Sequence, residues 1–127
     1  NAYEYFERIV NEIQQSFEYD IEVEYDTNCT LNAESAIYCG LIINELLTNS
    51  FKHAFSEKKS GFIKIDFFKD DNEYFLIYSD NGKGYDSTIK KESLGLILIE
   101  TLTRKQLKAK LDINSINGVK VKIKWKE

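Results

Sequence analysis

The stretch NELLTNSFKHA, residues 44–54, ends an unusually apolar segment and carries the polar residues on which the interpretation of the chain depends. Glu45 and Asn49 are four positions apart, so at about 3.6 residues per turn they share one side of a helix with Lys52 and His53. A carboxylate on a largely buried helix is costly unless a partner compensates it. The pattern indicates either a ligand-binding helix or an ordinary helix with an internal Glu45–Asn49 hydrogen bond.

If a ligand compensates the carboxylate, these side chains suit a phosphate accompanied by a magnesium ion. Asn49 offers a neutral oxygen to Mg²⁺, an ion that keeps most of its water and prefers few protein ligands together with phosphate oxygens. Lys52 would then meet a phosphate. Glu45, one turn before Asn49, could orient or deprotonate a nucleophile beside the terminal phosphate.

A glycine loop, DNGKG at residues 80–84, directly follows a strongly apolar predicted strand. Gly82 and Gly84 have no Cβ, so the backbone can approach a flat ligand such as a nucleobase. Asp80 could accept a hydrogen bond from an exocyclic amino group, which in a buried pocket distinguishes adenine from bases that present an oxygen. The loop alone is equally compatible with a plain Asp-Gly turn.

A third motif, SLGL, marks the point where a polar stretch, interpreted as a mobile lid, becomes a Leu-rich helix predicted for residues 94–108. The start of a helix presents unpaired N–H groups and a positive dipole end, where a polyphosphate could lie. The chain has no GxxxxGK[ST] and no GxGxxG after a first strand, which excludes the P-loop and the dinucleotide fingerprint. The motif consists of Ser93, Leu94, Gly95 and Leu96.

These three motifs, in this order, resemble those of the Bergerat-fold (GHKL) ATPases shared by histidine kinases, Hsp90, MutL and DNA gyrase. The Lys-His-Ala ending of the first motif, the short lid and the Ser-Leu-Gly-Leu form resemble the catalytic, ATP-binding domain (HATPase_c) of a sensor histidine kinase. The resemblance covers essentially all 127 residues. It implies an α/β sandwich with a mixed, mainly antiparallel sheet, helices on one face, and ATP with Mg²⁺ between the long helix and the lid.

The resemblance also implies a role for each matching residue. Glu45 is the candidate base, Asn49 the Mg²⁺ ligand and Asp80 the residue that recognises adenine. Lys52 and His53 are expected to approach the phosphates or the ribose, and Gly82 and Gly84 to shape the adenine pocket. The four residues of the third motif are expected to close over the phosphates: Ser93, Leu94, Gly95 and Leu96.

The implied activity is transfer of the ATP γ-phosphate to a histidine on a dimerisation domain of the same full-length protein, and from there to a response regulator. His53, the sole histidine, lies inside the ATP motif and is a poor phosphoacceptor, so the acceptor is expected on another segment, upstream of a leading helix at residues 1–19. Two alternatives stay open. One is a serine kinase resembling anti-sigma factors, and the other is a nucleotide-gated interaction module without transfer activity.

Three features depart from the pattern of these ATPases. The lid has no recognisable phenylalanine box, and the GxGLGL form of longer-lid relatives is reduced to SLGL. Gly118-Val119 stands where Gly-Thr is often found, which puts a water-mediated adenine contact in doubt.

Hydrophobic periodicity predicts the flanking elements of a single domain, residues 1–127. We expect a helix ending near Tyr19, a strand around Val23 and a helix that is capped at residues 30–32 and runs to about His53. A hairpin with its turn at residues 70–72 and a final hairpin whose last strand, residues 119–126, has one buried and one lysine-rich face complete the chain.

Composition narrows the class of protein. With 43% hydrophobic and 30% charged residues the chain is expected to fold by itself, and a net charge of −4 argues against a sequence-independent nucleic-acid binder. No apolar run is long enough to span a bilayer and no export signal opens the chain, so we expect a cytoplasmic domain without membrane contact, leaving open an anchor elsewhere in the full-length protein. Cys29 and Cys39 are expected to be reduced and structural.

Overall fold

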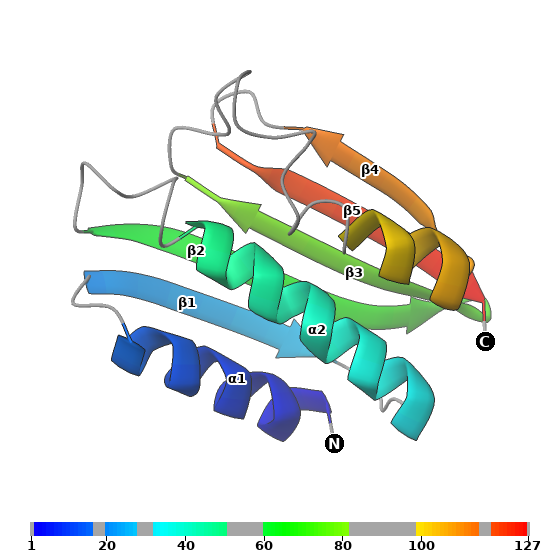
Figure 1. Ribbon diagram of the computed structural model, residues 1–127, viewed down its shortest axis with the longest axis horizontal. Coiled ribbons are helices and arrows are strands. Elements are labelled where there is room, and N and C mark those ends of the chain that lie inside the picture. The colour runs from blue at the N-terminus through cyan, green and yellow to red at the C-terminus, as the bar shows by residue number, and fades with distance from the viewer. Residues whose placement is uncertain are drawn as a thin grey trace.

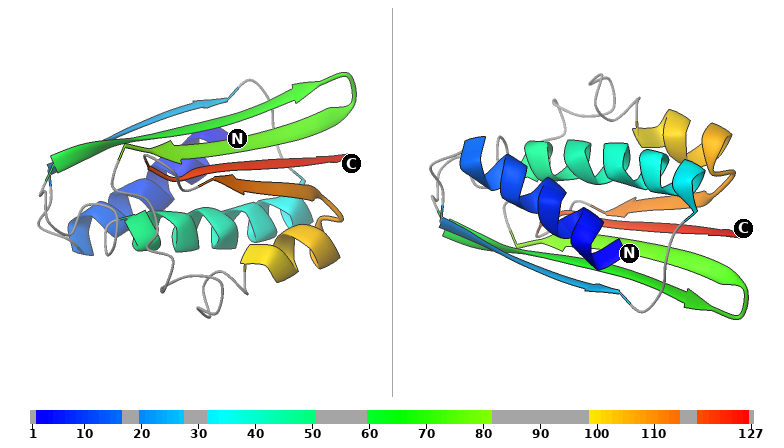
Figure 2. Two further views of the ribbon diagram at one scale, coloured as in Figure 1. Left: turned by 90° about the horizontal axis from the view of Figure 1, so that it is seen from above. Right: turned by 90° about the horizontal axis from the view of Figure 1, so that it is seen from below.

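The computed structural model describes residues 2–16, 20–27, 32–50, 60–81, 99–114 and 118–126, which form one five-stranded sheet with helices on one face. Figure 1 shows the sheet from its helical side, and Figure 2 shows the two layers from the edge. The arrangement confirms the predicted α/β sandwich. The elements are α1 (Ala2–Ser16), β1 (Asp20–Thr27), α2 (Ala33–Asn49), β2 (Ser60–Asp70), β3 (Glu73–Asp80), η2 (Leu102–Gln106), β4 (Lys110–Asn114) and β5 (Lys120–Lys126).

The sheet is mixed and mainly antiparallel, as predicted, with the strand order β1-β2-β3-β5-β4. β1 and β2 pair in parallel, whereas the other three neighbouring pairs are antiparallel. Parallel strands cannot be joined by a tight turn, so the chain between β1 and β2 must return to the end of the sheet where β1 began. The helix α2 lies in this crossover connection. As a result, the C-terminal end of α2 lies at the same end of the sheet as the C-terminal end of β3 (Figure 1).

The β2–β3 hairpin turns at Asp71 and Asn72, inside the predicted turn. Both residues have positive φ values, 53° and 66°, as a two-residue type I′ turn requires. Asp and Asn tolerate this left-handed conformation better than most residues do. The turn fixes the pairing of β3, and therefore the position of Asp80 at the opposite end of that strand.

The core lies between the sheet and the helices. Residues of β3 and β5 alternate between buried and more exposed positions, so Val121, Ile123 and Trp125 point into the core while Lys120, Lys122 and Lys126 are exposed. This confirms the two-faced last strand. α1 joins the core through Phe6, whose ring packs in a T-shaped arrangement with that of Phe67 at a centroid distance of 5.8 Å.

The helix predicted for residues 94–108 is described from Ile99 onward, and its last turns depart from the expected α-helical form. Residues Leu102–Gln106 form a π-helix, in which the N–H of Leu107 donates to the carbonyl of Leu102 at 3.0 Å. Lys108, at φ 53°, then ends the helix, and the Ala109 N–H caps the Thr103 carbonyl at 2.9 Å. Leu102, Thr103 and Leu107 are buried in this segment. Helical periodicity does not predict the π-helical form, which is rare.

Cys39 is buried in α2 with its thiol free, as expected for a reduced, structural cysteine. Burial raises the pKa of this thiol to about 12, so the reactive thiolate is scarce at neutral pH. Cys29 lies outside the described residues. None of the helices within the described ranges is long and apolar enough to cross a membrane.

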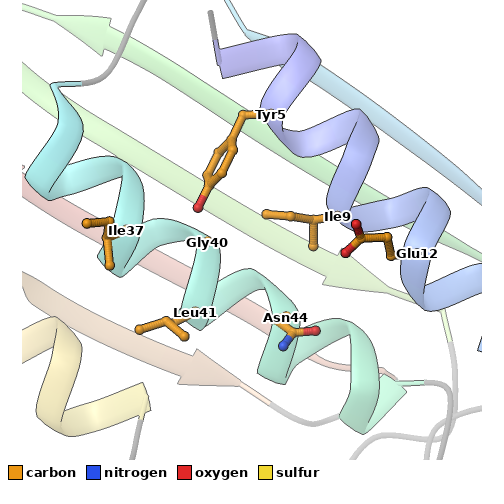
Figure 3. A pocket seen from close by; sticks show the side chains of 7 residues that line it. All are labelled: Tyr5, Ile9, Glu12, Ile37, Gly40, Leu41 and Asn44. Atoms are coloured by element: carbon orange, nitrogen blue, oxygen red, sulfur yellow. The ribbon is translucent and has the colours of Figure 1, made fainter.

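Gly40 lets α1 approach α2 closely. A Cβ atom at Gly40 would overlap the hydroxyl of Tyr5, which lies over this position in Figure 3. Alanine would otherwise favour the helix by about 0.5–1 kcal/mol, but overpacking costs about 1–3 kcal/mol. We therefore expect Gly40→Ala to lower the free energy of unfolding by about 1 kcal/mol, as measured by urea denaturation.

The same substitution in a Tyr5→Ala background isolates the cause. Without the Tyr5 ring, the propensity gain remains and Gly40→Ala should become stabilising by up to about 1 kcal/mol. A destabilisation of equal size in both backgrounds would show that Tyr5 is not the obstacle.

Candidate functional site

Asp80, the predicted adenine-recognising residue, ends β3 with its side chain buried at 8% exposure. Its Oδ2 accepts a hydrogen bond from Ser50 Oγ at 2.6 Å, and its Oδ1 accepts one from the backbone N–H of Val119 at 3.0 Å. The Asp80 N–H in turn donates to the Val119 carbonyl at 2.9 Å. The carboxylate is therefore held by donors from two elements that are far apart in the sequence, α2 and the segment entering β5.

Ser50 caps the C-terminal end of α2 and is 1% exposed. Its backbone is still helical, at φ −62° and ψ −46°, and its N–H reaches the carbonyls of both Leu46 and Leu47. Because the helix keeps its direction here, Ser50 stays on the face that packs on the sheet. Its Oγ lies 2.6 Å from the hydroxyl of Tyr78, which lies 3.1 Å from the Leu46 carbonyl oxygen.

Gly118 allows the chain entering β5 to pass against the end of β3. Its φ is +106°, and a Cβ atom here would collide with the backbone oxygen of Asp80. Glycine therefore brings the Val119 N–H within reach of the Asp80 carboxylate.

Asn81 fixes the beginning of the glycine loop to the neighbouring strand. Its Oδ1 accepts from the N–H of Phe62 at 2.8 Å, and its own N–H donates to the Phe62 carbonyl at 3.1 Å. These two bonds extend the β2–β3 pairing by one residue beyond Asp80. The residues leading from Asp80 toward Gly82 thus start from a fixed point.

Glu45 and Asn49 both lie on α2 and are half-buried. Asn49 immediately precedes Ser50, so it lies at the same end of the sheet as Asp80. The other predicted site residues lie outside the described residues: Lys52, His53, Gly82, Gly84, Ser93, Leu94, Gly95 and Leu96.

Asn44, the first residue of the NELLTNSFKHA motif, belongs to a different part of the surface. Its exposed side chain lines an open groove between α1 and α2 (Figure 3), and neither Ser50 nor Asp80 is among the residues that line this groove. The groove is lined by Tyr5, Ile9, Glu12, Ile37, Gly40, Leu41 and Asn44.

Sequence reasoning did not single out Ser50, Tyr78 or Asn81. Two signals were present in the sequence. Ser50 is a small hydroxyl residue beside the apolar run of α2, and Tyr78 occupies an inward position of an otherwise apolar alternation, where its hydroxyl needs a partner. Neither signal identifies Asp80 as the residue that completes the cluster.

No family model matches the chain, and no curated protein matches it. Solved structures do match. The histidine kinase domain from the Erythrobacter litoralis EL346 blue-light activated histidine kinase superposes with a TM-score of 0.82 at 24% identity, covering 94% of this chain and 58% of that chain. The mycobacterial sensor histidine kinase MprB has a TM-score of 0.77 at 15% identity, covering 98% of this chain and 95% of that one.

The catalytic domain of histidine kinase ThkA matches with a TM-score of 0.68 at 14% identity, over 95% of this chain and 92% of that one. The chain thus spans almost the full length of that catalytic domain but little more than half of the Erythrobacter kinase domain. At these identities the comparison concerns the arrangement of the backbone. The chain has the fold of the catalytic domains of histidine kinases.

Proposed function

We propose that this chain is the ATP-binding catalytic domain of a sensor histidine kinase, which transfers the ATP γ-phosphate to a histidine on a separate dimerisation domain. One observation carries the proposal. A buried carboxylate, Asp80, stands at the end of β3 with its oxygens held by Ser50 and Val119, at the end of α2 that carries Glu45 and Asn49. The fold, which is that of histidine kinase catalytic domains, gives this cluster its context.

Asp80 would recognise the adenine base. A carboxylate only accepts hydrogen bonds, and Ser50 and Val119 each hold one of its two oxygens in place. It fits the 6-amino group of adenine, a donor, and conflicts with the 6-oxygen of guanine or hypoxanthine. Gly82 and Gly84, two and four residues beyond Asp80, would shape the same pocket.

The donor set on α2 fits the phosphates and their metal ion. Asn49 offers a half-buried amide oxygen, the kind of ligand that suits Mg²⁺ when phosphate oxygens and water complete its shell. Bound Mg²⁺ would neutralise charge on the phosphates. Lys52 and His53 would approach the phosphates or the ribose, and Ser93, Leu94, Gly95 and Leu96 would close over them.

Glu45 would act on the receiving histidine. It precedes Asn49 by one helical turn and is half-buried, so its carboxylate could orient the imidazole or take its proton beside the γ-phosphate. The phosphoacceptor histidine belongs to a dimerisation domain of the full-length protein in this proposal, and a response regulator would take the phosphate from it.

The first test is nucleotide selectivity, measured by titration calorimetry with Mg-ATP and Mg-GTP. We expect the chain to bind ATP more tightly by at least about tenfold, because an unmade hydrogen bond to a charged group costs about 1.5–3 kcal/mol. Asp80→Asn should weaken ATP binding by a similar factor, with a thermal melt as the control for folding. Equal affinity for the two nucleotides, or Asp80→Asn binding ATP as tightly as the parent, would remove Asp80 from the adenine pocket.

A further inference from the structure

We infer that the outer face of the sheet is an interface between two copies of this chain. The outer face consists of the strand residues that alternate with the buried ones and point away from the helices. α1, α2 and η2 all lie on the opposite side of the sheet in the edge-on views of Figure 2, so none of the described helices covers the outer face. Its apolar centre and the placement of its charges fit a second copy.

The two central strands depart from the usual pattern of a sheet face in water, where the outward positions are polar. β5 follows that pattern with a lysine at every outward position. β2 and β3 instead place Phe68, Phe75 and Ile77 at outward positions, each half-buried. The rings of Phe68 and Phe75 stack at a centroid distance of 5.1 Å. The middle of the outer face is therefore apolar, as the centre of an interface usually is.

The charge of the outer face changes sign across the strands. Lys120, Lys122 and Lys126 of β5 are exposed on one side of the centre, and Glu22 and Glu24 of β1 are exposed on the other side. The strand order β1-β2-β3-β5-β4 places these two groups on either side of β3. One half of the face would repel a uniformly acidic or a uniformly basic partner. A second copy, turned around, presents the complementary halves.

A two-fold axis along β3 brings unlike charges together. β3 is the middle strand, so a half-turn about this axis places β5 of one copy over β2 of the other and leaves β3 facing β3. Asp66 and Lys122 both pair with Ile77 in the sheet, one from each side. The half-turn therefore sets Lys122 of each copy opposite Asp66 of the other. The same contact is made twice.

The side chains of this contact already lie over the outer face. Lys122 Nζ is 5.7 Å from the centroid of the Phe75 ring, and Asp66 Oδ2 is 3.9 Å from Lys64 Nζ. An ion pair at that distance between partly exposed side chains is weak, so Asp66 can also accept an approaching lysine. Long side chains that are held in place before association lose less entropy when they bind.

The size of the outer face sets the expected strength of the dimer. Five strands about 4.8 Å apart, with a rise of about 3.3 Å per residue, span on the order of 600 Å² per copy. Stable interfaces bury about 800 Å² per partner, so this interface lies at the lower end of the range. We therefore expect a dimer whose population rises with protein concentration and falls with salt, because salt screens exposed charges.

The test is sedimentation velocity of the 127-residue chain over a series of concentrations. Lys122→Glu and Asp66→Lys should each weaken self-association by at least about tenfold, because each variant sets two pairs of like charges against each other. An equimolar mixture of the two variants should dimerise again, since both contacts then join unlike charges. A parent chain that sediments as a monomer up to its highest soluble concentration, or two variants that dimerise as the parent does, would refute the interface.

The double variant Lys122→Glu with Asp66→Lys separates the interface from local damage. Lys122 pairs in register with Asp112 of β4, so Lys122→Glu places two acids side by side within one chain. The double variant keeps that local repulsion but makes both contacts between the copies attractive again. It should therefore dimerise like the parent. A double variant that stays monomeric would show that misfolding of the edge, and not a contact between copies, explains the single variant.

Glu34→Lys on α2 and Lys105→Glu on η2 are the matched controls. Both residues are exposed, and both changes alter the net charge as the test variants do, but on the helical side of the sheet. Neither should change the dimer, and an equal loss in these controls would mean that net charge alone governs association. The interface does not depend on the proposed nucleotide site, because the buried side chain of Asp80 is on the other side of the sheet.

Discussion

Glu45→Gln is expected to slow phosphotransfer by about 10² to 10⁴, the range lost when a positioned general base is removed. The substitution keeps the volume of the half-buried side chain and takes away its negative charge and basicity. The measurement is single-turnover transfer at saturating ATP to a supplied dimerisation domain that carries the acceptor histidine. ATP affinity should barely change, because the proposed role of Glu45 concerns the acceptor and not the nucleotide.

Asn49→Ala is the matched control on the same helix, because its proposed partner is the metal ion. It should weaken Mg-ATP binding, and the deficit should shrink as the Mg²⁺ concentration rises. Glu45→Gln should show no such dependence on Mg²⁺. The two substitutions, one turn apart on α2, would thus separate chemistry from metal binding.

The competing account makes Glu45 a structural acid of a half-buried helix face. In that case Gln would change the thermal melt or nothing at all, while transfer would proceed at the parental rate. A Glu45→Gln rate within about threefold of the parent, small beside the range expected for a base, would exclude Glu45 from the mechanism.

Much of the fold could be predicted because the periodicities are strong. The alternation of Val121, Ile123 and Trp125 with lysines predicts one buried and one wet strand face, and the structure has this pattern. The Asp71-Asn72 turn is confirmed as well, since few residue pairs adopt two positive φ values easily. The π-helical turn at residues 102–106 was missed, because hydrophobic periodicity does not distinguish it from an α-helical turn.

The site was predicted as a set of residues but not as a network. Asp80 could be singled out because a carboxylate between an apolar strand and two glycines is unusual. Its donors could not be, because Ser50 and Val119 lie 30 and 39 positions away and come together only through the crossover by α2 and the close passage of β5. The candidates at positions 52, 53, 82, 84 and 93–96 remain proposals.

Gly118→Ala is expected to have the largest effect on stability. Alanine at a φ of +106° is strained, which costs about 1–3 kcal/mol, and its Cβ would press on the Asp80 backbone oxygen, for which overpacking adds about 1–3 kcal/mol. The obstacle is backbone at the end of a paired strand and not the tip of a flexible side chain. We therefore expect a loss of about 3 kcal/mol or more in the free energy of unfolding, measured with urea.

Gly61→Ala, on β2, is the control for this measurement, because φ at Gly61 is not positive. Both substitutions reduce the conformational entropy of the unfolded chain, which stabilises the folded state by about 0.4–1 kcal/mol in each case. The difference between their free energies of unfolding therefore reports on the native state. Gly118→Ala should also weaken ATP binding at temperatures where the chain is still folded. Relief of the collision moves Val119 away from Asp80 and releases one oxygen of the carboxylate. If the free energies of unfolding of Gly118→Ala and Gly61→Ala differ by less than about 1 kcal/mol, the difference is smaller than the sum of the two expected costs. That result would mean that β5 can enter the sheet without a glycine at position 118.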